Sequence, residues 1–462
     1  MKLLDLLRTF SSREWPRFRA FVASPYFNRS TEAVRLCDWL DGQHPKFEDF
    51  DRTAAWQAVF SGQPFDEKTW NHLASALLKL AVQFVGQEQA QRDGAMPDFY
   101  QLRGLSERGL EKHYRFLFEK TARDLADGPL RDTRHFYQSY LFENLESERL
   151  VKQGERDFAQ NFQRTTDNLD YFFLTEKLKY TCAMLNSQHI VSASYSLHFV
   201  DEVRRFVEAN PLPPDAPGIA IYYRIFRLLT QDDAPEDFEA LKKLLAENGH
   251  RFTREELSQQ YQYALNYCIR QIRKVRERYT EEALLLYQTG INSGILLDAD
   301  GRLSPWHFKN VIKLGLNLRR YEWTERFILD RSPLLGEEFK SDALHYNLAD
   351  LYFHTGRKDE ALRHLNKVGF TDVHYSLGSK VMLAKIYHET DAFDALDSLL
   401  HAFNTYLRRN RIISEDVRKT YLNFIGLLRQ IIRAAPDKYP ALREQVEKTE
   451  LLTEKKWLLA QM

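Results

Sequence analysis

Histidine is the side chain most often used for metal binding and acid–base chemistry, and this chain of 462 residues contains 14 histidines. A helical zinc site of the HExxH type needs two imidazoles four residues apart on one face. The nearest match, HETDA at residues 388–392, has alanine where the second histidine is needed. Six histidines gather in the same region, on both helices of the expected hairpins: His345, His354, His364, His374, His388 and His401. We therefore expect structural histidines and no metal site.

Other catalytic motifs are missing from the sequence. There is no GxxxxGK[ST] or GxGxxG phosphate loop and no GxSxG nucleophile motif. The three cysteines, Cys37, Cys182 and Cys268, form no CxxC pair, which argues against a zinc site and against a disulfide framework. They are typical of buried apolar residues in a reducing compartment. The sequence therefore predicts a non-enzymatic protein without a cofactor; the alternative left open is an enzyme whose site is assembled from distant residues and shows no motif.

Charge and hydropathy limit the possible partners. Lys and Arg together number 65, as do Asp and Glu, so the whole chain carries no field that attracts polyanions. Nucleic-acid binding would therefore need a local basic patch. No run of 18 apolar residues occurs, and Asp5 and Arg8 interrupt the apolar run at the start of the sequence. We expect a cytoplasmic protein that does not contact a membrane.

Apolar residues recur at spacings of three and four along most of the chain, which predicts amphipathic helices. Helix-start signals agree with this pattern. Ser11 with Glu14, and Thr253 with Glu256, have the spacing of a capping box, and Ser304 precedes a proline. Alternating strand patterns are rare. The sequence predicts an all-α fold.

A repeat is visible in HYNLADLYFHTGRKDEALRHLNKV, residues 345–368, which predicts two helices joined by a turn at Gly356. A shift of 35 residues places Asp391 at this turn. The same shift, backward and forward from the start of the second helix, places Trp323 and Phe393 at equivalent positions. A helical hairpin exposes an apolar face when it is alone, so we expect an array of stacked hairpins.

This pattern resembles the tetratricopeptide repeat (TPR), a pair of antiparallel helices that recurs every 34 residues. Small residues at Ala349 and Ala361 would let the two helices approach closely. Neighbouring units depart from the pattern, with Leu396 and Arg326 at the second small position, so their packing must differ. The resemblance implies a right-handed α–α superhelix, here an irregular TPR-like solenoid with a small N-terminal helical domain.

Three regions are expected along the chain. The helix-breaking sequence RDGAMPD, residues 92–98, marks the clearest boundary. Residues 1–92 would form an N-terminal helical domain, residues 101–300 irregular helical hairpins, and residues 301–445 TPR-like repeats with C-terminal capping helices.

Five strings together resemble an uncharacterised family of bacterial helical-repeat proteins. They are ASPYFNRS (23–30), LNYCIRQI (265–272), LSPWHFKNVIKLGL (303–316), YLRRNRIISE (406–415) and TYLNFIGLL (420–428). No activity is assigned to that family, so the resemblance supports the repeat architecture and adds no chemistry.

Residues 51–85 also resemble the winged helix-turn-helix that precedes TPR-like repeats in some bacterial transcription activators. The resemblance implies a recognition helix at 68–85 with Lys68, Asn71, His72, Ser75 and Lys79 on its polar face. Arginines, which usually contact phosphates and guanines, are few here. We favour the alternative that this segment is a helical cap on the solenoid.

Two surfaces are candidates for binding. The resemblance to TPR arrays implies a concave face lined by the first helix of each hairpin, at Tyr346, Asp350, Phe353, Val381, Lys385 and His388. Tyr346 and Asp350 replace the Lys and Asn with which some arrays grip a terminal carboxylate, so a groove for an aromatic and polar peptide is expected instead. Alternatively, Tyr346 and Phe353 pack against neighbouring helices.

The second surface is basic and lies within residues 405–433, with Arg408, Arg409, Arg411, Arg418 and Lys419 as an anion or nucleic-acid patch. The alternative is a set of cations that favour a helix C-terminus, where Asn410 takes a left-handed cap. The segment IRQIRKVRER, residues 269–278, predicts a solvated helical stripe.

The leading hypothesis is a non-enzymatic scaffold that binds an unknown protein or peptide partner along the concave face. The alternative is a nucleic-acid-associated regulator that uses the N-terminal domain or the basic patch.

Overall fold

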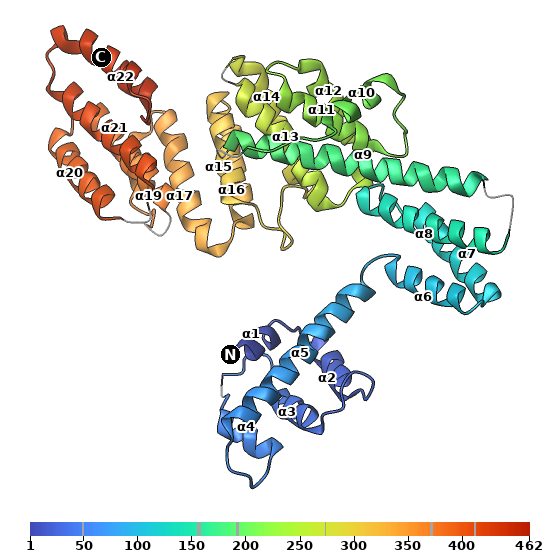
Figure 1. Cartoon of the computed structure of the whole chain (residues 1–462). Helices are drawn as coiled ribbons and strands as arrows, with labels where there is room; N and C mark the ends of the chain where they lie inside the picture. Colours follow the sequence, from blue (N-terminus) through green and yellow to red (C-terminus); the bar gives the residue numbers. More distant parts are fainter. Residues whose placement is uncertain (49, 155–158, 191–193, 273, 370–372, 411–412) are drawn as a thin grey trace. The chain divides into compact units, whose positions relative to one another are not determined.

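The computed structural model describes the chain as seven stretches, residues 1–48, 50–154, 159–190, 194–272, 274–369, 373–410 and 413–462. These residues form 23 α-helices and three short 3₁₀ helices, and their one β feature is an isolated bridge between Leu297 and Leu303 (Figure 1). The predicted all-α fold is confirmed. In the described stretches, no helix is both long enough and apolar enough to cross a membrane.

The chain forms two compact units, Met1–Glu176 and Lys177–Met462, and the boundary falls within helix α9 (Ala159–Ile190). The three sequence regions proposed above stay predictions about folding domains. The break expected at 92–98 is a turn in the structure, because α5 ends at Gln91 and Gly94 has a φ of +53°.

The first unit has an apolar core whose buried members all lie between Leu3 and Phe84. Three helices pack against the long α5 in this core (Figure 1). The predicted capping box is confirmed, because the Ser11 N–H donates to Glu14 Oε2 at 3.0 Å and the Glu14 N–H donates to Ser11 Oγ at 3.2 Å. The helices of this unit are α1 (Lys2–Leu7), α2 (Glu14–Ala23), α3 (Thr31–Asp41), α4 (Arg52–Val59), α5 (Glu67–Gln91), α6 (Met96–Glu107), α7 (Glu111–Asp127) and α8 (Thr133–Lys152).

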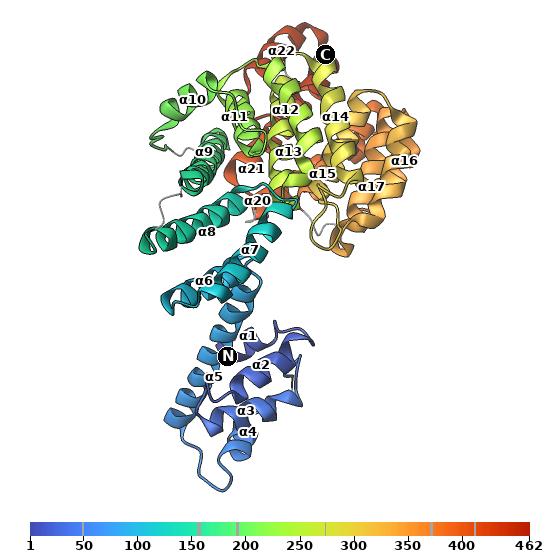
Figure 2. The ribbon, with the colours of Figure 1, turned by 90° about the vertical axis from the view of Figure 1, so that its right-hand side faces the viewer.

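The second unit is built from consecutive helical hairpins, which Figure 2 shows side by side. The pairs are α11 (Pro217–Thr230) with α12 (Pro235–Asn248), α13 (Arg254–Gln271) with α14 (Arg276–Asn292), α15 (Pro305–Asn317) with α16 (Tyr321–Arg331), α17 (Glu337–His354) with α18 (Lys358–Leu365), α19 (Val373–Glu389) with α20 (Phe393–Arg409), and α21 (Glu415–Arg433) with α22 (Tyr439–Lys448). Helix α10 (Val200–Ala209) precedes them and α23 (Lys455–Ala460) follows. The 3₁₀ helices are Gly249–Arg251, Ser332–Leu334 and Pro436–Lys438.

Two of the predicted helix starts in this unit differ in how their caps are made. Ser304 Oγ accepts the Trp306 N–H at 3.3 Å, with proline at the first helical position, as predicted. Thr253 Oγ1 accepts the Glu256 N–H at 3.3 Å, and the Glu256 carboxylate accepts the Tyr222 hydroxyl at 2.8 Å. Glu256 is buried, and this hydrogen bond ties α13 to α11.

The first helices of consecutive hairpins adjoin one another, since α15 packs against α17 and α17 packs against α19. The second residue after each of these three helices lies in the left-handed region, with φ of +55° at Arg319, +77° at Gly356 and +55° at Asp391. The turn predicted at Gly356 and its counterpart at Asp391 are therefore confirmed. This stacking is the solenoid-like arrangement expected of an array.

The spacing between turns corrects one prediction. Gly356 and Asp391 are 35 residues apart, as expected, but Arg319 precedes Gly356 by 37 residues. Phe393 is the first residue of α20, whereas Trp323 is the third residue of α16 and not the first. The residue that enters the left-handed turn is an arginine, so the usual glycine or asparagine signal for this position is absent from the sequence.

The corrected register explains how the irregular unit packs. The residue equivalent to the fully buried Ala361 is Thr324, which is also fully buried, so Arg326 is free to be exposed. Thr324 faces Gly315 so closely that a Cβ at Gly315 would collide with the Thr324 hydroxyl. The prediction that Arg326 is equivalent to Ala361 was wrong. With a spacing of 37 residues, Thr324 is the small buried residue at this position of the second helix.

Candidate functional site

Three charged residues occupy the same position in consecutive hairpins. Lys313 on α15, Asp350 on α17 and Lys385 on α19 each lie six residues before the left-handed turn residue of their hairpin. Because these three helices adjoin, the positions form one row of alternating charge. We call this row and the side chains around it the charged face: Lys313, Asp350, Phe353, His354, Lys385 and His388.

An ion pair lies at the centre of the charged face. Lys313 Nζ lies 2.6 Å from Asp350 Oδ2, and the exposed fractions of the two side chains are 43% and 4%. Burial opposes the ionised form of Asp350, but the Lys313 ammonium and a hydrogen bond from His354 outweigh it, so the pKa of Asp350 is lowered. Burial likewise opposes the charge on Lys313, and the Asp350 carboxylate reverses this effect, so the pKa of Lys313 is raised. Both groups are held in their charged forms.

His354 is the third member of this centre. Its Nδ1–H donates to the backbone oxygen of Asp350 at 2.8 Å and lies 3.4 Å from the Asp350 carboxylate. The hydrogen bond to Asp350 raises the pKa of His354, with burial acting in the opposite direction. The Asp350 carboxylate thus lies between the Lys313 ammonium and the His354 imidazole.

Tyr346 and Val381 were predicted to line the binding face, but both side chains are buried. The centres of the Tyr346 and Tyr375 rings are 5.3 Å apart, and Lys309 Nζ lies 5.3 Å from the centre of the Tyr346 ring. Gly378 on α19 makes room for Tyr346, because a Cβ at Gly378 would lie 2.6 Å from the Tyr346 hydroxyl oxygen. Tyr346 therefore packs against a neighbouring helix, the alternative expected from the sequence, while Asp350 is buried under Lys313.

Of the other residues predicted for this face, Lys385 and His388 contact a later part of the chain, and Phe353 lies against Lys385. Lys385 Nζ lies 2.8 Å from Glu454 Oε2 and 4.7 Å from the centre of the Phe353 ring. The Trp457 ring lies 5.4 Å from His388 in an edge-to-face arrangement. Lys385 and His388 therefore contact a segment of the same chain, and binding of another protein at this face stays a prediction.

Residues 451–462, which we call the docked segment, include α23. Trp457 Nε1 donates to Glu389 Oε1 at 2.8 Å, and Leu458 is fully buried in the apolar cluster formed with α19–α22. Asn423 Nδ2 donates to the Leu451 oxygen at 2.9 Å, which fixes the start of the segment. Glu454 has a φ of +53°, and this left-handed residue immediately precedes α23.

A histidine pair joins α17 to α18 within the same hairpin. His345 Nδ1 lies 3.0 Å from His364 Nδ1, so one ring donates and the other accepts. Burial lowers the pKa of both histidines. The side chain of His374 lies outside the described residues. No group of three or more His, Cys, Asp or Glu side chains in the described part of the chain is placed to hold a metal ion.

The histidine pair predicts acid sensitivity. The folded pKa values lie below the ordinary value of 6.5, so the folded hairpin binds fewer protons than the unfolded one, and stability is lost as the pH falls below about 6.5. We expect His364→Gln, which cannot titrate, to reduce the drop in melting temperature between pH 7.5 and pH 5.5 by about 2 °C. Circular dichroism measures it, with His401→Gln at an exposed position as the control. An unchanged drop in the His364 variant would contradict the prediction.

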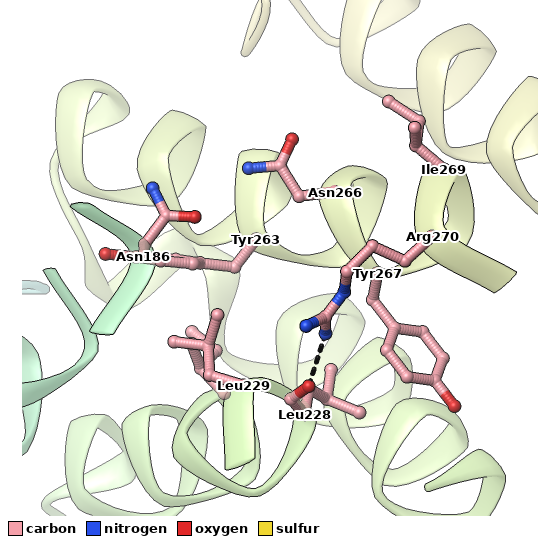
Figure 3. Close-up of a pocket in the computed structure, with 9 residues that line it drawn as sticks. Asn186, Leu228, Leu229, Tyr263, Asn266, Tyr267, Ile269 and Arg270 are labelled. Atoms are coloured by element: carbon pink, nitrogen blue, oxygen red, sulfur yellow. Dashed lines mark hydrogen bonds between the residues drawn. The ribbon is translucent and has the colours of Figure 1, made fainter. Parts of the chain in front are cut away.

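The second unit also contains a cavity of about 340 Å³ between α9, α11 and α13. Figure 3 shows its polar rim, with Asn186, Tyr263, Asn266 and Arg270, over an apolar wall that includes Leu228 and Leu229. Burial raises the pKa of Tyr263 to about 12. None of the nine lining residues is a carboxylate, histidine or cysteine, so these residues supply no general base or nucleophile near neutral pH.

Arg270, on the rim of this cavity, corrects the interpretation of residues 269–278 as one solvated stripe. Helix α13 ends at Gln271 and α14 begins at Arg276, so no continuous helical face exists. The Arg270 guanidinium donates to the backbone oxygen of Leu228 near the end of α11 (Figure 3). Cations interact favourably with helix C-termini, so this arginine stabilises the hairpin junction.

The basic patch predicted within residues 405–433 is divided by the fold. Arg418 Nε donates to the Leu407 oxygen at 3.0 Å, and its Nη2 donates to the Asn410 oxygen at 3.2 Å and the Ile413 oxygen at 3.1 Å. Arg418 therefore closes the end of α20. Asn410 itself is extended, with φ of −81° and ψ of 108°, so the left-handed cap expected there is wrong.

The other cations of the patch differ in exposure and in structural description. Arg408, Arg409 and Lys419 are exposed, and Arg411 lies outside the described residues. A basic pocket of about 450 Å³ lies nearby between α21 and α22, lined in part by Arg429, Gln430, Arg433, Lys438 and Gln445.

In the first unit, the five polar residues predicted on the recognition helix are all exposed along α5. They are Lys68, Asn71, His72, Ser75 and Lys79. The opposite face of α5 is buried in the core through Trp70, Leu73 and Leu77. This arrangement is compatible both with a helical cap on the solenoid and with a recognition helix that enters the DNA major groove, so the preference for the cap stays a prediction.

Lys313, Glu454 and Trp457 are residues of this site that sequence reasoning missed. Lys313 was missed because a uniform shift of 35 residues aligns Asp350 with Gly315, whereas the true spacing of 37 residues aligns it with Lys313. The only sequence signal for the docked segment is its composition, a glutamate three residues before a tryptophan and two leucines.

The fold and the site define an all-α protein of stacked helical hairpins, in which Lys385 and His388 contact a later segment of the same chain. Comparison with protein-family models, with curated proteins and with solved structures finds no match. The resemblances to tetratricopeptide repeats and to a bacterial family stay predictions.

Proposed function

We propose that this chain is a non-enzymatic, TPR-like scaffold that binds a segment of another protein on the charged face. The observation that carries the proposal is the row formed by Lys313, Asp350 and Lys385, equivalent positions on three adjoining helices. A row of this kind offers a bound segment a regular series of charges, and Phe353 adds an aromatic surface beside it.

The chemistry of the site supports binding over catalysis. Asp350 and Lys313 neutralise each other, and the pKa shifts of both groups favour the charged forms, which do not exchange protons near neutral pH. The proposed compartment is the cytoplasm, because the free thiols of Cys37, Cys182 and Cys268 are all buried, as predicted, and lie far apart in the sequence.

Capture of the tagged full-length chain from the cells that make it tests the proposal. We expect Lys385→Glu to reduce the captured partner at least about tenfold, since reversal of a buried interfacial charge leaves the partner's charge unpaired. Lys340→Glu, at a more exposed lysine on α17 that pairs with Glu337, is the matched control. A partner retained equally by both variants would place binding elsewhere on the chain.

A nucleic-acid-associated regulator is the second candidate function. The exposed cations Arg408 and Arg409 and the basic pocket between α21 and α22 favour it. Capture with and without nuclease separates the two functions. Partners that vanish with nuclease, together with affinity that falls steeply as salt increases, would promote the second candidate above the first.

A further inference from the structure

The docked segment presents two recognition groups to the charged face. Its carboxylate, Glu454, pairs with Lys385, and its indole, Trp457, contacts His388 and donates to Glu389. The two groups are three residues apart: Glu454 directly precedes α23 with a left-handed φ of +53°, and Trp457 lies in the first turn of that helix. Leu458 follows directly and is fully buried.

On the charged face, the environment of Lys385 complements these two groups. The Lys385 side chain is only 12% exposed, and its ammonium lies 4.7 Å from the Phe353 ring centre and 5.8 Å from the Trp457 ring centre. A largely buried ammonium between two rings needs a carboxylate partner, which Glu454 supplies. The Glu454 charge also acts on the pKa values of Lys313 and Tyr346, so it belongs to the same electrostatic centre as the row.

We propose that the docked segment is an internal ligand, and that the partner of the charged face is a short protein segment with the pattern Glu-x-x-Trp-Leu that displaces it. This inference rests on the proposed function and names its substrate class. The chemistry is acidic and aromatic: one carboxylate for Lys385, one indole whose N–H reaches Glu389, and one apolar residue for the pocket that holds Leu458.

The docked segment covers part of the charged face and therefore lowers the apparent affinity of any partner that binds there. A partner binds only the fraction of molecules in which the docked segment is released, so its apparent dissociation constant rises by the ratio of closed to open molecules. Weakening the contacts of the segment lowers this ratio and strengthens binding in trans, without any change on the face itself.

The test uses the full-length chain and a fluorescent peptide of residues 450–462. The releasing variant is Glu454→Ala with Trp457→Ala, which removes both recognition groups from the chain and leaves the face intact. We expect it to bind the peptide at least about tenfold more tightly than the wild-type chain, by fluorescence anisotropy. A peptide that carries Glu454→Lys and Trp457→Ala is the control and should not bind.

A charge exchange tests the pairing directly. Adding Lys385→Glu to the releasing variant should weaken binding of the peptide at least about tenfold, and a peptide with Glu454→Lys should recover it. A releasing variant that keeps its helical circular dichroism and still fails to bind the peptide would overturn the inference. Equal binding by the Lys385→Glu chain would do the same.

If the releasing variant does not fold, the charge exchange between residues 385 and 454 can be made within one chain. Lys385→Glu alone should expose residues 449–454 to protease, and Lys385→Glu with Glu454→Lys should restore protection. Failure of the exchange to restore protection would contradict the inference. A captured partner that depends on Lys385 but is not displaced by the peptide would overturn this inference and leave the proposed function intact.

Discussion

Replacing Lys313 with methionine is expected to lower the free energy of unfolding of the second unit by about 3 kcal/mol, the lower end for breaking a buried pair. The variant leaves the carboxylate of Asp350, only 4% exposed, without its closest counter-charge. Urea denaturation followed by circular dichroism, with hydrogen exchange of α17 amides to locate the effect, measures the change.

The opposite deletion should cost less. The Lys313 side chain is 43% exposed and that of Asp350 only 4%, so Asp350→Leu leaves the less buried charge of the pair without its partner. The double variant with Lys313→Met and Asp350→Leu should lie within about 1 kcal/mol of the wild-type chain, because no buried charge remains. Equal losses in the Lys313→Met and double variants would show that shape, and not charge, fixes this centre.

Gly378→Ala is expected to destabilise the second unit by about 2 kcal/mol. Alanine is normally the better helix former by about 1 kcal/mol, but at Gly378 its Cβ would lie 2.6 to 2.9 Å from three atoms of the Tyr346 side chain. The ring cannot withdraw easily because Tyr346 is buried against Tyr375.

Gly426→Ala is the matched control for this substitution. Gly426 lies inside α21, and a Cβ there meets no heavy atom within 4 Å, so the variant should gain about 1 kcal/mol from helix propensity. The prediction fails if both glycine variants change the urea midpoint in the same direction. Tyr346→Leu together with Gly378→Ala should recover part of the loss, since the clash is with the ring.

The sequence predicted most of the helical framework because the relevant signals are local. Apolar spacing marks the helices, Gly356 marks the central turn, and Ser11 and Ser304 mark helix starts whose caps the structure confirms. Phe353, Lys385 and His388 were expected to meet another protein, and that expectation stays a prediction. In the structure, Lys385 and His388 contact a segment of the same chain.

The remainder of the site depends on information that local patterns do not carry. Arg319 adopts a conformation that glycine usually takes, so nothing in the sequence revealed the 37-residue spacing that places Lys313 beside Asp350. The pairing of Lys385 with Glu454 spans 69 residues and depends on how α21 and α22 return the chain to α19. A tertiary contact of this kind leaves no periodic pattern.

The separation of Lys385 from Glu454 also orders events during synthesis. When Lys385 leaves the ribosome, Glu454, whose carboxylate will pair with it, lies 69 residues further along the chain and has not yet emerged. At ordinary translation rates of about 5 to 20 residues per second, that interval is roughly 3 to 14 s. If the hairpins from α15 to α19 fold within this interval, a newly made molecule presents an open charged face to its surroundings before its own chain covers it.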